Sequence, residues 1–428
     1  MMLSSAAKNW RIGKLARDTV VMSLGTGLRA AAQAIVFIII ARILGRAGYG
    51  AFVAVLSTAS FLSGLSGLGA HVLLVRDVAR APERFSTSWG MTLAAIAISA
   101  PMIFLIYLAI SYAVLPQGIS IHVILLFGAS EVILWPLTNV AAFAYQAHER
   151  MGRASRMMLA PVISRLGSAI AFLVIERWHL AEPLLTWAIF YTSAAAISVT
   201  YVHHCVLRDI GKAIFPTPSQ LVSYVQESLP FSFWAIAEKL YFDADKVMLA
   251  RFGSLSAAGV YSAGYRLVDL AFLPLYAMLN VVAPRFFRAG DNGLHSALKY
   301  ALRISLGPLA YAFVAGACLY IFAPLLPLLL GEDFRDAVKA VRFLAWLPAI
   351  TLPRILLQYA LATSNHQKTG AVCVVFGAIV NIGLNLTWIP VWGWRGAAAA
   401  TYVSEIIMSL VVFGSTFSKV DRSILNGR

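Results

Sequence analysis

The chain has 428 residues, of which 60% are hydrophobic and only 12% are charged, and its formal net charge is +15. Because soluble domains usually carry about 25% charged residues, this composition excludes a soluble globular protein and indicates a polytopic membrane protein. The three cysteines lie in apolar segments without paired spacing, so we expect neither a disulfide framework nor a metal site.

Twelve apolar segments are long enough to cross about 30 Å of hydrocarbon. They cover about 19–43, 48–75, 88–114, 119–146, 156–176, 183–207, 228–250, 256–284, 301–323, 337–362, 369–391 and 395–417. Most connections between them are short, which favours antiparallel neighbours and leaves no room for a soluble domain. The sequence therefore predicts an all-α membrane protein with about 12 transmembrane helices.

The pattern of the first hairpin returns in the second half of the chain. Arg42 and Arg251 both close a long apolar segment, and Arg76 and Arg285 repeat the same spacing of 209 positions. This repeat predicts two six-helix lobes related by a pseudo-twofold axis along the membrane normal. The expected domains are a basic interfacial segment at 1–18, an N-terminal lobe at 19–207, a linker at 208–227, a C-terminal lobe at 228–417 and a tail at 418–428.

Basic residues are distributed unevenly between the loops. One set of loops carries most of the loop lysines and arginines, including Arg76, Arg80 and Arg84, whereas the other set carries few, including Arg42 and Arg46. The positive-inside rule therefore predicts that both termini are cytoplasmic. Topology accounts for much of the net charge, so no nucleic-acid partner is expected.

Several motifs resemble one family of transporters. The residues are Arg42-Ile43-Leu44-Gly45 followed by Tyr49-Gly50, then Gly67-Leu68-Gly69 and Arg76, and in the second lobe Asn381, Trp388-Ile389-Pro390, Gly393 and Gly396. They resemble the polysaccharide transporter (O-antigen flippase) family of the multidrug/oligosaccharidyl-lipid/polysaccharide exporter superfamily. The resemblance implies export of polyprenyl-diphosphate-linked oligosaccharide across the bacterial inner membrane for O-antigen, capsule or exopolysaccharide. It also implies that membrane lipid and polysaccharide polymerase machinery are partners of the protein. No cofactor is expected, and no phosphate loop that would bind ATP is present in the sequence.

The seventh segment carries five charged residues, Glu238, Lys239, Asp243, Asp245 and Lys246. Each charge costs about 2.5 to 3.5 kcal/mol at the centre of a membrane helix, so this helix must face protein or water. The charges fall on one broad side of the helix. Two interpretations follow: they line an aqueous cavity, or Lys239 pairs with Asp243 while Lys246 reaches the interface.

The same acids, together with Asp269, are candidates for coupling to a proton or sodium gradient. Arg266 lies three residues before Asp269, and this spacing favours a structural ion pair.

Arg29 and Arg165 lie near the middle of the first and fifth segments without an acid in the adjacent turn. Because guanidinium binds phosphate bidentately and stays charged, we expect these arginines, with Lys239, to bind the diphosphate and sugar of the substrate. The alternative is that each arginine pairs with Glu131, Glu238 or Asp243 on another helix.

Other functions remain open at this point. A multidrug or organic-cation antiporter would share the fold, but a cation site is expected to be acidic or aromatic, and basic residues at mid-depth argue against it. A lipid-II flippase is a further alternative of the same kind. A membrane glycosyltransferase would need Asp243 and Asp245 as a metal-binding pair, but both acids lie within a span. The protein is therefore expected to be a transporter and not an enzyme.

Overall fold

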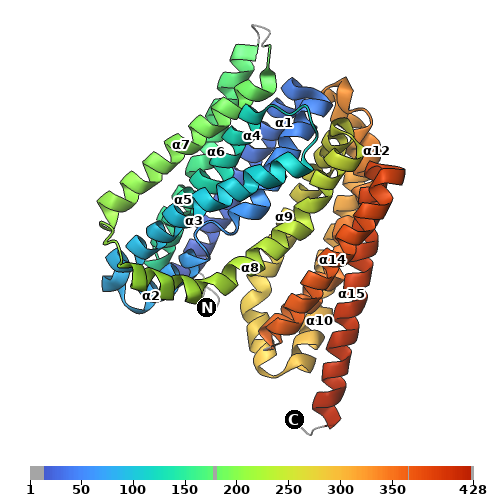
Figure 1. Ribbon diagram of the computed structural model, residues 1–428. Helices are drawn as coiled ribbons and strands as arrows, with labels where there is room; N and C mark the ends of the chain where they lie inside the picture. Colours follow the sequence, from blue (N-terminus) through green and yellow to red (C-terminus); the bar gives the residue numbers. More distant parts are fainter. Residues whose placement is uncertain (1–13, 177–180, 365, 426–428) are drawn as a thin grey trace, which may run out of the picture.

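The computed structural model describes residues 14–176, 181–364 and 366–425, and these residues form helices joined by turns and short loops (Figure 1). Ten helices or helix pairs are long and apolar enough to cross a membrane. The first of them, 27–63, contains both limbs of the first hairpin, and the 31-residue helix α8 is a further long helix beside the ten. The expected two lobes of six membrane-crossing segments are therefore present.

The N-terminal lobe contains the chain's first seven α-helices. They are α1 (Lys14–Ser63), α2 (Ala70–Arg80), α3 (Phe85–Val114), α4 (Ile121–Gly128), α5 (Trp135–Ala147), α6 (Met151–Glu176) and α7 (Pro183–Asp209). The 3₁₀ turn η1 (Pro82–Arg84) precedes α3, and a π-helical turn, η2 (Ala129–Leu134), joins α4 to α5. The segment expected at 119–146 is thus one crossing made of three helical pieces.

The C-terminal lobe follows the same plan. Its long helices are α8 (Pro218–Met248), α9 (Leu255–Asp291), α10 (Leu294–Phe322), α12 (Ala337–Leu344), α13 (Leu347–Thr363), α14 (Gln367–Trp392) and α15 (Trp394–Leu425). Short turns complete it: η3 (Leu249–Gly253) continues α8, and η4 (Ala323–Leu325), α11 (Leu326–Leu330) and η5 (Glu332–Phe334) lie between α10 and α12.

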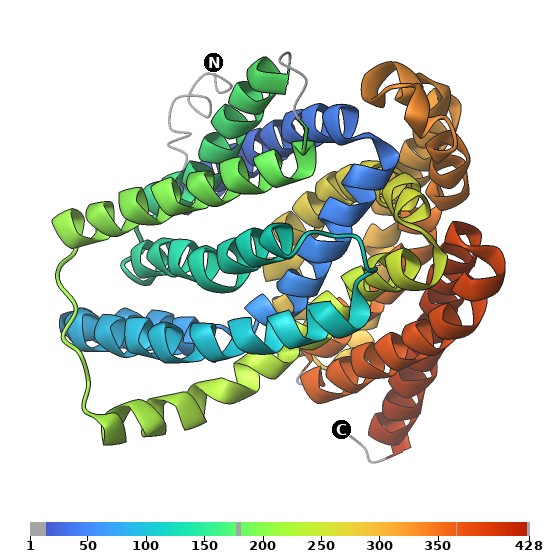
Figure 2. The ribbon, with the colours of Figure 1, turned by 45° about the horizontal axis from the view of Figure 1, so that its top comes forward.

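The first hairpin bends at one residue. The two limbs of α1 meet at Gly45, whose φ of 63° and ψ of 179° are not helical and favour glycine. Figure 2 shows the dark blue helix change direction sharply at this point. The reversal expected in the glycine-rich stretch 42–50 is therefore present, but it takes place at one residue and not over a loop.

The second limb is not the single helix expected over 48–75. α1 ends at Ser63, and a turn containing Gly67, Leu68 and Gly69, all with positive φ, leads into α2. The connection between α7 and α8 is shorter than the linker expected over 208–227, because α7 ends at Asp209 and α8 begins at Pro218. Thr217 and Gln220 cap that helix by reciprocal side-chain to backbone hydrogen bonds. The predicted tail is likewise helical as far as Leu425.

The two lobes meet backbone to backbone at a pair of glycines. A Cβ atom on Gly50 would lie 1.8 Å from the carbonyl oxygen of Leu255, and one on Gly259 would lie 1.9 Å from that of Arg46. Gly50 and Gly259 are separated by the repeat spacing of 209 positions, so they are equivalent in the two lobes. No side chain fits here, and the two helices α1 and α9 are closed against each other at this end.

Candidate functional site

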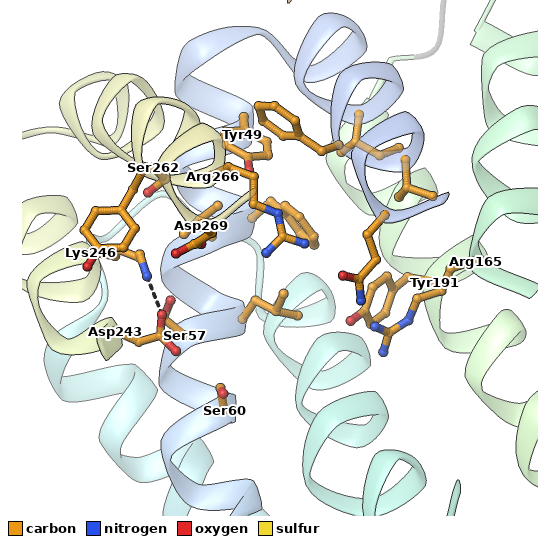
Figure 3. A pocket seen from close by; sticks show the side chains of 18 of the residues that line it. Tyr49, Ser57, Ser60, Arg165, Tyr191, Asp243, Lys246, Ser262, Arg266 and Asp269 are labelled. Carbon is orange, nitrogen blue, oxygen red and sulfur yellow. Dashed lines mark hydrogen bonds and ion pairs between the residues drawn. The ribbon is translucent and has the colours of Figure 1, made fainter. Parts of the chain in front are cut away.

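A cavity of about 250 Å³ lies between the lobes, directly beyond this glycine contact (Figure 3). One face of the second limb of α1 forms its wall at helical spacing, from Tyr49 through Ser57 to Ser60. The opposite wall comes from α8 and α9, and α6 and α7 close the side. Its charged or polar lining residues include Gln33, Glu131, Arg165, Tyr191, Asp243, Lys246, Ser262, Tyr265, Arg266 and Asp269.

Arg165 is paired within the N-terminal lobe. Its Nη2 donates to Glu131 Oε1 at 2.9 Å, and the Tyr191 hydroxyl donates to the same oxygen at 2.6 Å. The guanidinium also lies over the Tyr191 ring, 4.2 Å from its centroid. Of the alternatives that the sequence left open, the pair with Glu131 is the one formed. Arg165 Nε has no hydrogen-bond partner in the described part of the chain.

Glu131 owes its position to the π-helical turn. Such single turns widen the helix locally and are frequent at functional sites. The turn brings the carboxylate of this buried residue toward α6 and α7.

On the other side of the cavity, Asp243 pairs with Lys246 and not with Lys239. Lys246 Nζ donates to Asp243 Oδ1 at 2.5 Å, the contact dashed in Figure 3. Lys239 Nζ instead donates to Ser60 Oγ at 3.2 Å and Ser63 Oγ at 3.0 Å. The charged face expected on this helix does line a cavity, since Asp243 and Lys246 border it.

The expected ion pair between Arg266 and Asp269 is not formed. Neither residue makes an ion pair with any residue that the structure describes. In Figure 3 the Arg266 guanidinium projects into the cavity. Both side chains also line a second cavity of about 440 Å³, which shares Gln33 with the first.

Arg29 lies one turn before Gln33, and its charge and that of Arg266 repel each other. Among the described residues Arg29 has no ion-pair partner either. Arg29 on α1 and Arg266 on α9 thus come from different lobes, are close enough for their charges to repel each other, and form no ion pair with a described residue. Their distance from each other along the chain explains why the sequence did not associate them.

Asp245, another predicted coupling acid, does not line either of these cavities. Asp245 is 3% exposed and accepts hydrogen bonds from the Tyr261 hydroxyl at 2.5 Å and the Lys246 backbone N–H at 2.8 Å. Glu238, the fourth predicted coupling acid, has a side chain outside the described part of the structure. Of the predicted acids, Asp243 and Asp269 are thus the two placed on a cavity wall.

Glu405, on α15, is buried beside Arg354 of α13. Arg354 Nε and Nη2 donate to its two carboxylate oxygens at 2.7 and 3.0 Å, and the Tyr241 hydroxyl adds a third hydrogen bond at 2.5 Å. Both charges are visible in the sequence, but nothing in it indicates that they pair, because the two residues are 51 positions apart.

The comparisons with known proteins agree with this fold. Residues 15–289 match the family of polysaccharide biosynthesis proteins. The probable low-salt glycan biosynthesis flippase Agl15 of Haloferax volcanii is 20% identical over 287 residues, which are 66% of this chain and 59% of that protein. The matched region thus spans less than two thirds of that relative's length.

Solved structures resemble the chain over nearly its whole length. The inward-facing structure of a MATE-family multidrug transporter has a TM-score of 0.76 at 15% identity and covers 92% of this chain and 95% of its own. A superfamily transporter from Pyrococcus furiosus, described as having a binding pocket of reverse polarity, scores 0.66 at 15% identity, with 95% of both chains covered. An outward-facing MATE-family structure scores 0.64 at 15% identity, with 95% and 96% covered. These likenesses show the fold.

Since the family match covers well over half of the sequence, the chain belongs to the family of polysaccharide biosynthesis proteins.

Proposed function

We propose that this protein moves polyprenyl-diphosphate-linked oligosaccharide repeat units across the bacterial inner membrane for surface polysaccharide synthesis. The observation that carries the proposal is Arg266, which lines both interlobe cavities and forms no ion pair with a described residue, while the like charge of Arg29, one turn before the cavity residue Gln33, is close enough to repel it. A cation within a membrane is costly unless an anion joins it. Two guanidinium groups, one from each lobe, suit the two phosphates of a diphosphate.

The two cavities accommodate a substrate that is polar at one end and apolar at the other. The first is lined by charged and hydroxyl-bearing side chains. The second has apolar residues of α9, Leu270, Phe272 and Leu273, on one part of its wall, and Arg266, Asp269 and Glu405 also line it. We infer that the diphosphate lies at Arg29 and Arg266 and that the polyprenyl chain leaves past these apolar residues of α9 toward lipid.

Transport would proceed by alternating access about the cavity. The contact at Gly50 and Gly259 closes the end of the interface that the positive-inside rule assigns to the outside. The higher TM-score to an inward-facing transporter supports the same assignment. Outward opening requires α1 and α9 to separate at these two glycines.

Gradient coupling is assigned to Asp269. It lines both cavities, it lies next to Arg266, and it has no ion-pair partner among the described residues. Acids of this kind within membranes mark proton and ion pathways. Binding of a proton or sodium ion there would change the charge that Arg266 presents to the diphosphate. Asp243, Asp245 and Glu238 remain further candidates from the sequence.

Deletion and complementation in the source organism test the proposal. Loss of the protein should abolish a surface polysaccharide and leave its lipid-linked repeat unit in the inner leaflet. The wild-type gene should restore the polysaccharide, and Arg266→Ala should not. Normal polysaccharide combined with heightened sensitivity to cationic dyes would overturn the proposal and favour organic-cation export, the alternative that the MATE-like fold permits.

A further inference from the structure

A third cavity, of about 280 Å³, lies in the N-terminal lobe on the side of the charged cavity away from the glycine contact. It is bordered by the turn between α1 and α2, by α3 and α5, and by Lys239 of α8. Its polar and aromatic lining residues are Ser63, Ser66, His71, Thr92, Trp135, Asn139, Phe143 and Lys239. None of its lining residues is acidic, in contrast to the charged cavity, which has three carboxylates.

Two of its polar side chains have unused hydrogen-bonding groups. Asn139 and His71 make no side-chain hydrogen bond to any residue that the structure describes, although both are largely covered. An amide offers two N–H donors and one acceptor oxygen with two lone pairs, and a neutral imidazole offers one donor and one acceptor. These groups are therefore available to a ligand or to water.

Aromatic rings form another part of the wall. The Phe143 ring stacks on His71 with 4.7 Å between centroids. Trp135 lies near both cavities, because it lines the third and its ring centroid is 5.0 Å from the guanidinium of Arg165, which lines the charged one. Flat apolar faces next to unpaired donors and acceptors suit a ring that is apolar on its face and polar at its edge.

The third cavity adjoins the charged one. Ser60 lines the charged cavity, Ser63 lines the third, and Lys239 Nζ hydrogen-bonds to both hydroxyls at 3.2 and 3.0 Å. A molecule bound in both would thus pass Lys239. The charged cavity lies between the glycine contact and the third cavity, so the third lies toward the end that the topology rule places in the cytoplasm.

We propose that this third cavity binds an uncharged pyranose of the oligosaccharide, close to the diphosphate, with its ring face on Trp135 and Phe143 and its hydroxyl or N-acetyl groups on Asn139 and His71. This inference rests on the proposed function, since it takes the diphosphate to lie in the charged cavity. The small volume suits a single sugar unit better than a whole repeat. The remaining sugars would extend into the cytoplasmic aqueous phase.

The test compares two sets of short probes that differ only in the sugar. The affinity of the purified full-length protein in detergent is measured for farnesyl diphosphate and for farnesyl diphosphate carrying one N-acetylglucosamine, glucose or galactose. At least one sugar-bearing probe should bind about tenfold more tightly than the sugar-free probe. Asn139→Ala should reduce this advantage to about twofold and leave the affinity for farnesyl diphosphate unchanged. Phe143→Leu should reduce it too.

Asn292→Ala is the matched control, because Asn292 is an exposed amide on the loop after α9. It should change neither affinity. The inference is overturned if no sugar raises the affinity, or if the advantage survives both Asn139→Ala and Phe143→Leu, even though farnesyl diphosphate binds. If none of the probes binds to the wild-type protein, the proposed function itself fails and takes the inference with it.

Discussion

Each lobe contains one arginine, one glutamate and one tyrosine in mutual contact, but the two clusters differ in completeness. In the C-terminal lobe Arg354 makes two hydrogen bonds to Glu405 and a third to Gln358 Oε1 at 2.8 Å. Its side chain is 8% exposed and that of Glu405 is 4% exposed. In the N-terminal lobe Arg165 makes one hydrogen bond to Glu131, and the two side chains are 18% and 10% exposed.

The difference separates a structural ion pair from one that is able to exchange partners. The Arg354 cluster ties α13, α15 and α8 together with most of its donors used. Arg165 borders the charged cavity and keeps an unpartnered Nε. The same three residue types thus hold helices together in the C-terminal lobe and are available to a ligand in the N-terminal lobe. The reason is that Arg354 uses most of its hydrogen-bond donors within its cluster, whereas Arg165 does not.

Removing one member of the saturated cluster should have the largest effect on stability. Glu405→Ala leaves Arg354 buried and uncompensated, which should cost about 3 to 5 kcal/mol in free energy of unfolding. Thermal unfolding in detergent measures the loss, and Arg354→Met combined with Glu405→Leu should recover much of it. A Glu405→Ala protein as stable as wild type would remove the distinction between the clusters.

Glu131→Gln should reduce stability less than Glu405→Ala does, and it should strengthen the binding of farnesyl diphosphate. The amide keeps a hydrogen bond to Arg165, so we expect a loss of about 1 to 2 kcal/mol. Without the competing carboxylate, Arg165 is available to add a contact to a diphosphate held at Arg266 in the same cavity, so the protein should bind farnesyl diphosphate several-fold more tightly. Weaker binding at unchanged stability would contradict a ligand role for Arg165 and make its pair with Glu131 structural, like that in the other lobe.

The exposed pair of Arg76 on α2 and Glu227 on α8 should contribute least. Hydrogen bonding and charge from Arg76 hold the pKa of the Glu227 carboxyl below its ordinary value of about 4.3. A depressed folded-state pKa adds stability above the unfolded pKa, and this is lost as pH falls through the folded value. Glu227→Gln should therefore lower the unfolding temperature at pH 7, but only slightly because the pair is exposed, and the variant's unfolding temperature should fall less steeply than that of the wild type below about pH 4.3. A large fall in the unfolding temperature of Glu227→Gln at pH 7 would show instead that surface pairs hold the lobes together.

The crossing segments could be predicted from sequence because lipid imposes a length and a hydropathy on each of them. The break at Gly67-Leu68-Gly69 could not, since the apolar run continues through it and only the backbone angles reveal the turn. The start of α8 was missed for a related reason: Pro216 and Pro218 suggest a linker, but proline is also favoured in a helix's first turn.

The charged residues of the site were predictable as a set but not as pairs. Asp243 has lysines at i−4 and i+3, and helical spacing permits both, so only the structure distinguishes Lys246 from Lys239. Arg266 was assigned to Asp269 by the same local rule, although its side chain points into the cavity. The tyrosines that complete the clusters, such as Tyr191 and Tyr241, carry no charge and so gave no signal.

Reconstituted transport by Arg266 variants tests the central claim most directly. The rate at which vesicles containing the wild-type protein, Arg266→Lys or Arg266→Ala translocate a polyprenyl-diphosphate-linked oligosaccharide is measured beside the unfolding temperature of each protein. Because a charge-assisted hydrogen bond contributes about 1.5 to 3 kcal/mol, Arg266→Ala should slow translocation by about 10- to 100-fold at an unchanged unfolding temperature, and Arg266→Lys should retain part of the rate. Stable Arg266→Ala and Arg29→Ala proteins that translocate at the wild-type rate would contradict the assignment of the diphosphate to these arginines.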